Sequence, residues 1–189
     1  QWKKPFSRQQ VVSSSNLELV DRAITDGAFH AGRDIGIAVH NDYEKSPKIE
    51  WVVGVFSGIN EELPAFSGTA NPTTGAVTGS FGFTPKTTKP LLVARLGYNH
   101  NKIKGYGPEA DLDGGALRAA VAVSGIVEFD ADRNSLAEHR VQADFVVKND
   151  GLSVSGAGYL MTAGTGVADN QGLTLAGVHV QGGYVVDKK

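Results

Sequence analysis

The sequence predicts an all-β chain of the antiparallel kind that closes into a transmembrane β-barrel. Three observations support this: segments in which apolar and polar residues alternate, segments longer than most soluble strands, and 24 glycines scattered through apolar stretches. Alternation with a period of two places one kind of side chain on each face of a strand. Glycine inside strands is typical of twisted or curved sheets. We expect residues 1–189 to form a single barrel domain or a fragment of one.

The alternation is clearest in residues 139–148, where the apolar side chains of Val141, Ala143, Phe145 and Val147 share one parity. The side chains of the other parity include Arg140, Gln142 and Asp144. Residues 117–129 repeat the pattern over about 40 Å, at 3.3 Å per residue, which exceeds a typical soluble strand. Further strands are expected at 2–6, 34–40, 48–57, 91–98, 152–161 and 174–186. Long strands with small and polar residues on one face are typical of a wide, water-filled lumen.

The connections between these strands differ in length. Residues 148–151 (Lys-Asn-Asp-Gly) predict a tight hairpin, because Asn and Gly tolerate the positive φ angles of the favoured turns. Residues 58–90 form a long connection rich in Gly, Thr and Pro, and 162–173 are a shorter one of similar composition. Long loops at one rim and tight turns at the other are typical of membrane barrels.

One short helix is expected within residues 16–28. Leu17, Val20 and Ile24 recur there at helical spacing, and Asn16 or Ser15 can cap the first turn. The segment lies between two expected strands, where we expect a loop folded into the lumen.

Composition excludes several classes of function. The net charge of −2 argues against a general nucleic-acid binder. Without cysteine there is no disulfide, thiolate metal site or cysteine nucleophile. No apolar run approaches the roughly 20 residues of a transmembrane helix. The histidines are widely spread, the acidic run Glu109–Asp113 lacks the spacing of a calcium-binding hand, and no acid, base and nucleophile stand together, so we expect neither a metal, nor a cofactor, nor an enzyme.

Several short motifs near the start of the chain carry a resemblance to a known family. They are Pro-Phe-Ser-Arg, a serine run, Val-Asp-Arg, Ala-Phe and Gly-Arg-Asp-Ile-Gly, at Pro5–Arg8, Ser13–Ser15, Val20–Arg22, Ala28–Phe29 and Gly32–Gly36. A later strand and turn pattern covers Val93–Tyr98, Gly105-Tyr106 and Glu109–Gly114. In these motifs the chain resembles the phosphate-selective porin O and P family, well over 4–57 and less closely over 91–130.

The resemblance implies a porin in the outer membrane of a Gram-negative bacterium. Members of that family are sixteen-stranded barrels, usually homotrimers, which let phosphate or other small anions diffuse through a lumen that carries Arg and Lys. The chain offers about eight expected strands, half of what such a barrel needs. We therefore expect either a fragment of such a porin or a smaller closed barrel.

An anion pore needs cationic side chains that replace part of the hydration shell of the anion. The predicted lumen residues are Arg8, Arg22, Arg33, Arg95, Arg118 and Arg140. Lys3 and Lys4 are further candidates. The opposing interpretation is that these are ordinary solvated or ion-paired charges. The carboxylates that share the inner parity oppose an anion field; they are Glu50, Glu128 and Asp144.

A second hypothesis stays open, namely a soluble or surface β-sandwich binding module, such as a carbohydrate binder. It would use the loops at 58–90 and 99–116, and its apolar strand faces would bury against each other. The barrel hypothesis instead predicts an aromatic girdle at the membrane surfaces. The aromatic residues near strand ends or on the apolar parity are Trp2, Trp51, Tyr98, Phe129, Tyr159 and Tyr184.

Overall fold

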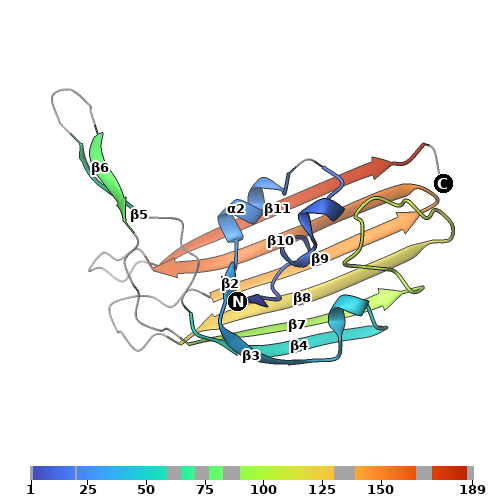
Figure 1. The fold of residues 1–189 in the computed structure, drawn as a ribbon, viewed down its shortest axis with the longest axis horizontal. Coiled ribbons are helices and arrows are strands. Elements are labelled where there is room, and N and C mark those ends of the chain that lie inside the picture. The colour runs from blue at the N-terminus through green and yellow to red at the C-terminus, as the bar shows by residue number, and fades with distance from the viewer. Residues whose placement is uncertain are drawn as a thin grey trace.

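The chain folds around one large antiparallel β-sheet (Figure 1). The computed structural model describes residues 2–19, 21–58, 65–70, 77–82, 90–129, 139–164 and 172–186. In spatial order the seven strands of the sheet are β11 (Gly172–Tyr184), β10 (Leu152–Gly164), β9 (His139–Asn149), β8 (Arg118–Glu128), β7 (Leu91–His100), β4 (Ile49–Phe56) and β3 (Gly36–His40). Sheet neighbours follow one another along the chain, apart from a separate hairpin between β4 and β7, so the sheet is a meander.

The predicted fold class is confirmed at the level of a mostly β chain with one antiparallel sheet. Seven of the expected strands lie in this sheet. The tight turn is confirmed as well, since β9 ends at Asn149, β10 begins at Leu152, and Asp150 and Gly151 between them have φ angles of 49° and 92°. Short-range alternation and turn chemistry therefore suffice to place these strands.

The strand expected at residues 2–6 is wrong in its extent and its place. Only β1 (Trp2–Lys3) is extended, and it pairs with β2 (Arg33–Asp34) outside the large sheet. Pro5 has no N–H to donate to a ladder, and the Phe6 N–H turns back to the Lys4 carbonyl at 2.8 Å. The chain bends at this point instead of continuing as a strand.

Residues 2–34, which we call the N-terminal segment, cover one face of the sheet (Figure 1). The segment contains α1 (Arg8–Val11), the 3₁₀ turn η1 (Ser14–Asn16) and α2 (Ile24–Phe29). The Ser7 hydroxyl caps α1 by accepting a hydrogen bond from the Gln10 N–H at 3.3 Å.

The helix expected within 16–28 is present only in its last part, as α2. Ile24 is 92 % exposed, so the helical spacing does not mark a buried face. Val20 lies outside the described residues. Tertiary bonds fix the chain before α2 instead, because the Glu18 N–H donates to Glu109 at 3.0 Å and the Glu18 carboxylate accepts from the Ser153 hydroxyl at 2.5 Å. Such contacts override weak local propensity.

The sheet is open, which differs from the predicted closed barrel. β3 and β11 lie at its two edges, and among the described residues neither pairs with a second strand. Within the connection at 58–90 the structure adds a hairpin of β5 (Ala65–Ala70) and β6 (Val77–Gly82), which alternation did not predict. A further 3₁₀ turn, η2 (Tyr43–Lys45), lies between β3 and β4.

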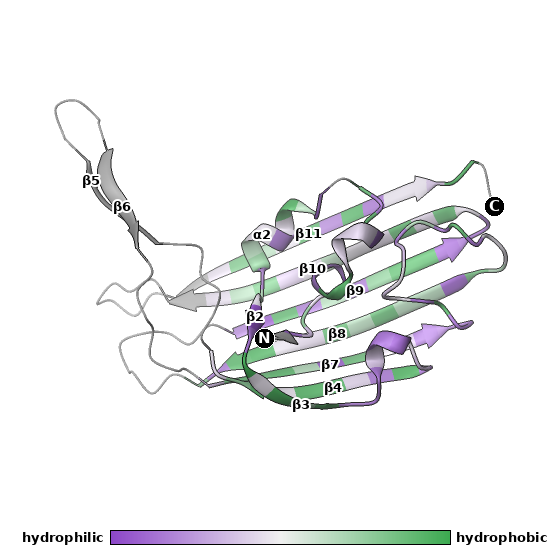
Figure 2. Ribbon diagram, viewed as in Figure 1, coloured by the Kyte–Doolittle hydropathy of each residue, from purple (hydrophilic) through white to green (hydrophobic). Residues whose placement is uncertain are grey.

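The two faces of the sheet have opposite character, and the strands alternate between hydrophilic and hydrophobic residues (Figure 2). In β4 every second residue is exposed, and the exposed ones are Ile49, Trp51, Val53 and Val55. The alternate residue Glu50 is fully buried beneath other parts of the chain. This is the reverse of a soluble one-sided sheet, whose apolar face is covered and whose polar face meets water.

The turn between β9 and β10 yields a stability prediction. Gly151→Ala should destabilise the fold by about 1 kcal/mol, because its φ of 92° is strained for a residue with a Cβ. Gly158→Ala is the control, since a Cβ at Gly158 meets no atom within 4 Å. Equilibrium urea unfolding of both variants measures the difference, and an equal effect at the two sites would contradict the account.

Candidate functional site

The uncovered face of the sheet is apolar from edge to edge. Residues that pair directly across antiparallel strands point to the same face. One row across the sheet consists of Trp51, Leu96, Val123, Ala143, Gly158 and Val178. The next row consists of Val39, Val53, Ala94, Gly125, Val141, Leu160 and Ala176. Neither row contains a polar side chain, so a broad apolar surface lies open.

The aromatic residues of the predicted girdle divide between the two faces. Trp51, Tyr98, Phe129 and Tyr184 are exposed, as the prediction requires. Tyr159 instead is 3 % exposed on the covered face, where its ring stacks on Phe29 of α2 at 5.1 Å between centroids. Trp2 has no described side chain.

The covered face holds an apolar cluster beside a polar one. In the apolar cluster Phe6 and Phe29 of the N-terminal segment pack with Ile126 of β8 and Tyr159 of β10. Ile126 has the parity of the polar residues, and its burial under Phe6 and Phe29 explains why an apolar residue stands there. The cluster fastens the segment to the sheet.

The polar cluster is centred on Arg95 of β7, which is 2 % exposed. Its two terminal nitrogens donate to the two carboxylate oxygens of Asp144 on β9 at 2.7 and 2.9 Å, a bidentate pair. Its Nε donates to Tyr106 at 2.9 Å and to Glu50 on β4 at 3.3 Å. A single guanidinium thus links three strands and the loop after β7.

Arg8 of α1 adds a second cation to the same cluster. Its Nε lies 3.2 Å from Asp144, its Nη1 donates to the Gly105 carbonyl at 2.9 Å, and its guanidinium carbon lies 4.7 Å from the centre of the Tyr106 ring. Burial raises the pKa of Tyr106, so the hydroxyl stays protonated and donates to Glu50 at 2.6 Å. Two cations and two carboxylates balance, so the cluster is neutral as a whole.

The main chain of the N-terminal segment joins this cluster at one point. The Phe6 carbonyl accepts hydrogen bonds from Arg95 at 3.2 Å and from Gln142 at 2.7 Å, and also from the Ser124 hydroxyl. The carbonyl therefore lies on side chains of three neighbouring strands, which fixes the position of Phe6 and Arg8.

The remaining arginines on the strands also contact carboxylates or carbonyls. Arg118 donates to Asp111, and Arg140 donates to the His30 carbonyl at 2.5 Å. Lys4, a further candidate, lies 3.6 Å from Asp34 in a buried pair. Arg118 and Arg140 have the parity of the covered face, as predicted, and the charges of Arg118 and Lys4 are matched by carboxylates within the chain.

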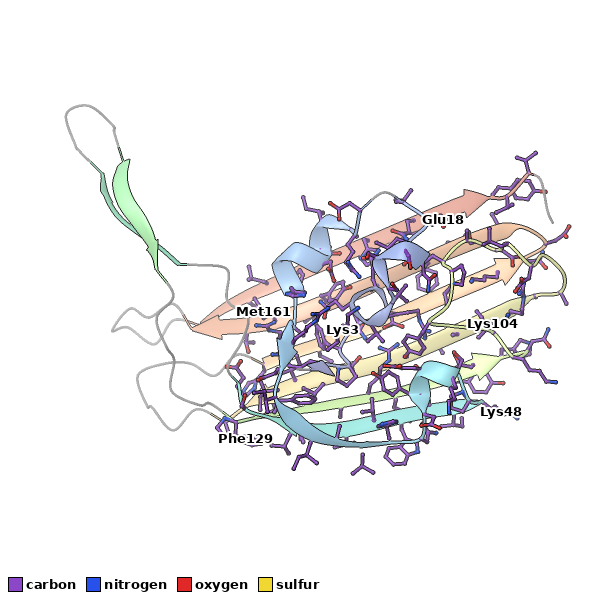
Figure 3. The ribbon with its side chains drawn as sticks, viewed as in Figure 1. Lys3, Glu18, Lys48, Lys104, Phe129 and Met161 are labelled. Carbon is purple, nitrogen blue, oxygen red and sulfur yellow. The ribbon has the colours of Figure 1, made fainter. Side chains whose placement is uncertain are left out.

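A different group of cations lines an open cavity of about 420 Å³ on the N-terminal segment. Lys3, Arg22 and Arg33 line it together with Asp26 and Ser13. Figure 3 shows Lys3 beside β2, on the side of the sheet that the segment covers. Burial, and then the neighbouring guanidinium groups of Arg22 and Arg33, lower the pKa of Lys3. With three cationic side chains and one carboxylate in its lining, the cavity has an excess of positive charge.

The structure thus separates the six predicted arginines into three groups, of which Arg118 and Arg140 make the separate contacts described above. Arg8 and Arg95 join the neutral cluster, whereas Arg22 and Arg33 share the cavity. Sequence reasoning did not identify Tyr106 or Asp26 as site residues. Gly105-Tyr106 belongs to the motifs of the resemblance, which offered a signal for Tyr106. Asp26 was visible in the sequence only as a neighbouring charge four residues after Arg22.

No family model, curated protein or solved structure matches the chain. The fold and the site define a mostly β protein built on one open antiparallel sheet with an internal polar cluster. No helix in the described part of the chain is long and apolar enough to cross a membrane. Within the same residues no group of three or more His, Asp or Glu side chains is placed to hold a metal ion.

The buried cluster yields a second prediction. Arg95→Leu should lower the free energy of unfolding by about 3–5 kcal/mol, because it leaves Asp144 and Glu50 buried with one cation between them. The double variant Arg95→Leu/Asp144→Leu should cost less than the single one, since it removes one charge of each sign. Urea unfolding followed by tryptophan fluorescence measures both.

The control for this prediction is Lys104→Leu, whose ammonium is largely exposed and lies 3.7 Å from Asp113. An exposed pair of this kind contributes about 0–1 kcal/mol. A double variant that is less stable than Arg95→Leu alone would show that the buried charges do not act as a balanced set.

Proposed function

We propose that the chain forms part of the wall of an outer-membrane β-barrel porin, which lets phosphate or other small anions diffuse passively through its lumen. The sheet's apolar face lies against lipid, and the N-terminal segment lies in the lumen. The observation that carries the proposal is the reversed sheet, whose exposed face is apolar and whose polar face is covered. Water disfavours such a surface on a soluble monomer, and contiguous apolar patches of this breadth mark interaction with lipid or protein.

The dimensions of the apolar face support contact with lipid. On β8 and just beyond it, the outward positions from Ala119 to Phe129 span ten residues, about 33 Å of strand. A tilt of about 40°, usual in membrane barrels, reduces this to about 25 Å, the height of the apolar band of such barrels. The neighbouring strands supply the matching rows described above.

Anion passage is supported by the cavity with Lys3, Arg22 and Arg33, whose guanidinium and ammonium groups offer donors to an oxyanion. Arg33 is exposed, and no hydrogen bond from its guanidinium to another described residue is present. The porin would complete its barrel with further strands beyond β3 and β11, and we propose a homotrimer by the family resemblance.

The β-sandwich hypothesis receives less support from the described residues. A sandwich buries its apolar strand faces against a second sheet. Here the N-terminal segment packs on the polar face, and the large apolar face carries Val121, Val123 and Val141 at about half exposure. A monodisperse protein without detergent would nevertheless favour the sandwich.

Substitution on the apolar face tests the contact with lipid. Val123→Arg should destabilise the protein in lipid vesicles by about 2–4 kcal/mol, because it places a charge near the middle of the bilayer. Leu112→Arg, which replaces an exposed apolar side chain in the loop after β7 with the same charge, is the matched control and should change stability little. Urea unfolding in vesicles measures both variants, and equal stability of the two would contradict the orientation.

Conductance tests the transport function. The complete protein in a planar bilayer should form open channels whose reversal potential in a KCl gradient shows preference for chloride over potassium. Cation preference, or no conductance, would overturn the porin proposal.

A further inference from the structure

The cavity on the N-terminal segment contains one carboxylate that lacks hydrogen bonds. Asp26 is 7 % exposed, and its Oδ1 atom is buried without a partner. Its Oδ2 atom lies 3.7 Å from Nε of Arg22, too far for a hydrogen bond. Because Oδ1 has almost no accessible surface, Oδ2 is the oxygen through which Asp26 lines the cavity, and a donor bound there would stabilise this largely buried carboxylate.

The cations around Asp26 are held in place by the main chain. Arg22 donates from Nε to the Gln9 carbonyl at 3.0 Å and from Nη2 to the Val12 carbonyl at 2.9 Å. Lys3 donates to the Val11 carbonyl at 3.3 Å. Arg33 pairs with Lys3 in the register of β1 and β2, which brings both side chains to the same small sheet. Lys3 and Arg22 are thus preorganised at the cavity, whereas only the backbone of Arg33 is fixed there, by its pairing with Lys3.

The size and charge of the cavity limit the ligand. Three cations and one carboxylate leave a net charge of +2, which matches a dianionic group. A volume of about 420 Å³ is that of a site for a small organic molecule and exceeds what a single inorganic anion fills. A ligand that satisfies Asp26 must also carry a hydrogen-bond donor beside its anionic group.

We propose that this cavity binds a phosphate monoester that carries hydroxyl groups, of the sugar-phosphate class. The phosphate lies among Lys3, Arg22 and Arg33, and a hydroxyl of the ligand donates to Asp26. The inference deepens the proposed function because it names a class of substrate for the lumen. It rests on that function in one respect, namely that the cavity opens onto the transport path.

Isothermal titration calorimetry of the purified chain in detergent tests the proposal with three probes. Glucose 6-phosphate should bind about tenfold more tightly than methyl phosphate, which has the same phosphate monoester without hydroxyls. Inorganic sulfate, which has neither an ester carbon nor a hydroxyl, should bind more weakly than glucose 6-phosphate. Arg33→Ala should weaken the binding of both phosphate esters.

Asp26→Ala should reduce the preference for glucose 6-phosphate over methyl phosphate to less than about twofold, without weakening methyl phosphate. Asp113→Ala, which removes an exposed carboxylate outside the cavity, should leave the preference unchanged. Equal binding of the two esters by the unaltered chain, a preference that persists in Asp26→Ala, or an absence of binding would each overturn the inference.

The outcomes are separate from those of the porin proposal because the titration requires no conductance. Anion-selective channels without binding of glucose 6-phosphate would overturn the ligand class and leave the porin proposal standing. Binding by a chain whose complete protein does not conduct would overturn the porin proposal alone.

Discussion

The buried guanidinium of Arg95 is the interaction on which the rest of the structure depends. It links Asp144 of β9, Glu50 of β4 and the Phe6 carbonyl of the N-terminal segment. Charges away from water are tolerated only when they are paired and hydrogen-bonded. The cluster is therefore satisfied only when the strands are in register and the N-terminal segment lies on the sheet. One set of contacts fixes both the sheet and its cover.

This arrangement determines which face of the sheet remains open. The N-terminal segment hydrogen-bonds to the polar side chains, so the apolar rows, such as the one through Trp51 and Val123, have no cover among the described residues. In water such a face is unfavourable, whereas in lipid it is the surface that a barrel wall requires. If the chain is part of a porin, as we propose, the covered polar face belongs to the lumen, and the cavity with Arg22 and Arg33 lies on the path of a solute. The proposed membrane contact and the proposed anion binding thus rest on the same division of faces.

The strands were predictable because parity is a local property of the chain, and Asn149-Asp150-Gly151 specifies its turn within a few residues. Parity also placed Arg95, Glu50 and Asp144 on one face. Their contacts depend on register between residues far apart in sequence, 49 positions for Arg95 and Asp144, which no local pattern specifies. The first part of the helix expected within 16–28 did not form for the same reason, since Glu18 is held by Glu109 and Ser153. Closure of the sheet likewise requires further strands that pair with β3 and β11, and no local sequence pattern specifies such pairing.

The lipid contact of the apolar face is the central claim, and the absence of cysteine allows a direct measurement of it. Single spin labels attached through Val121→Cys, Val123→Cys and Val127→Cys on β8, in the complete protein in vesicles, report accessibility to oxygen and to a water-soluble nickel chelate. The account predicts high oxygen and low chelate accessibility at all three positions, with low values of both at Ala120→Cys and Ser124→Cys on the covered face. Higher chelate than oxygen accessibility at the valine positions, or no alternation along β8, would contradict it.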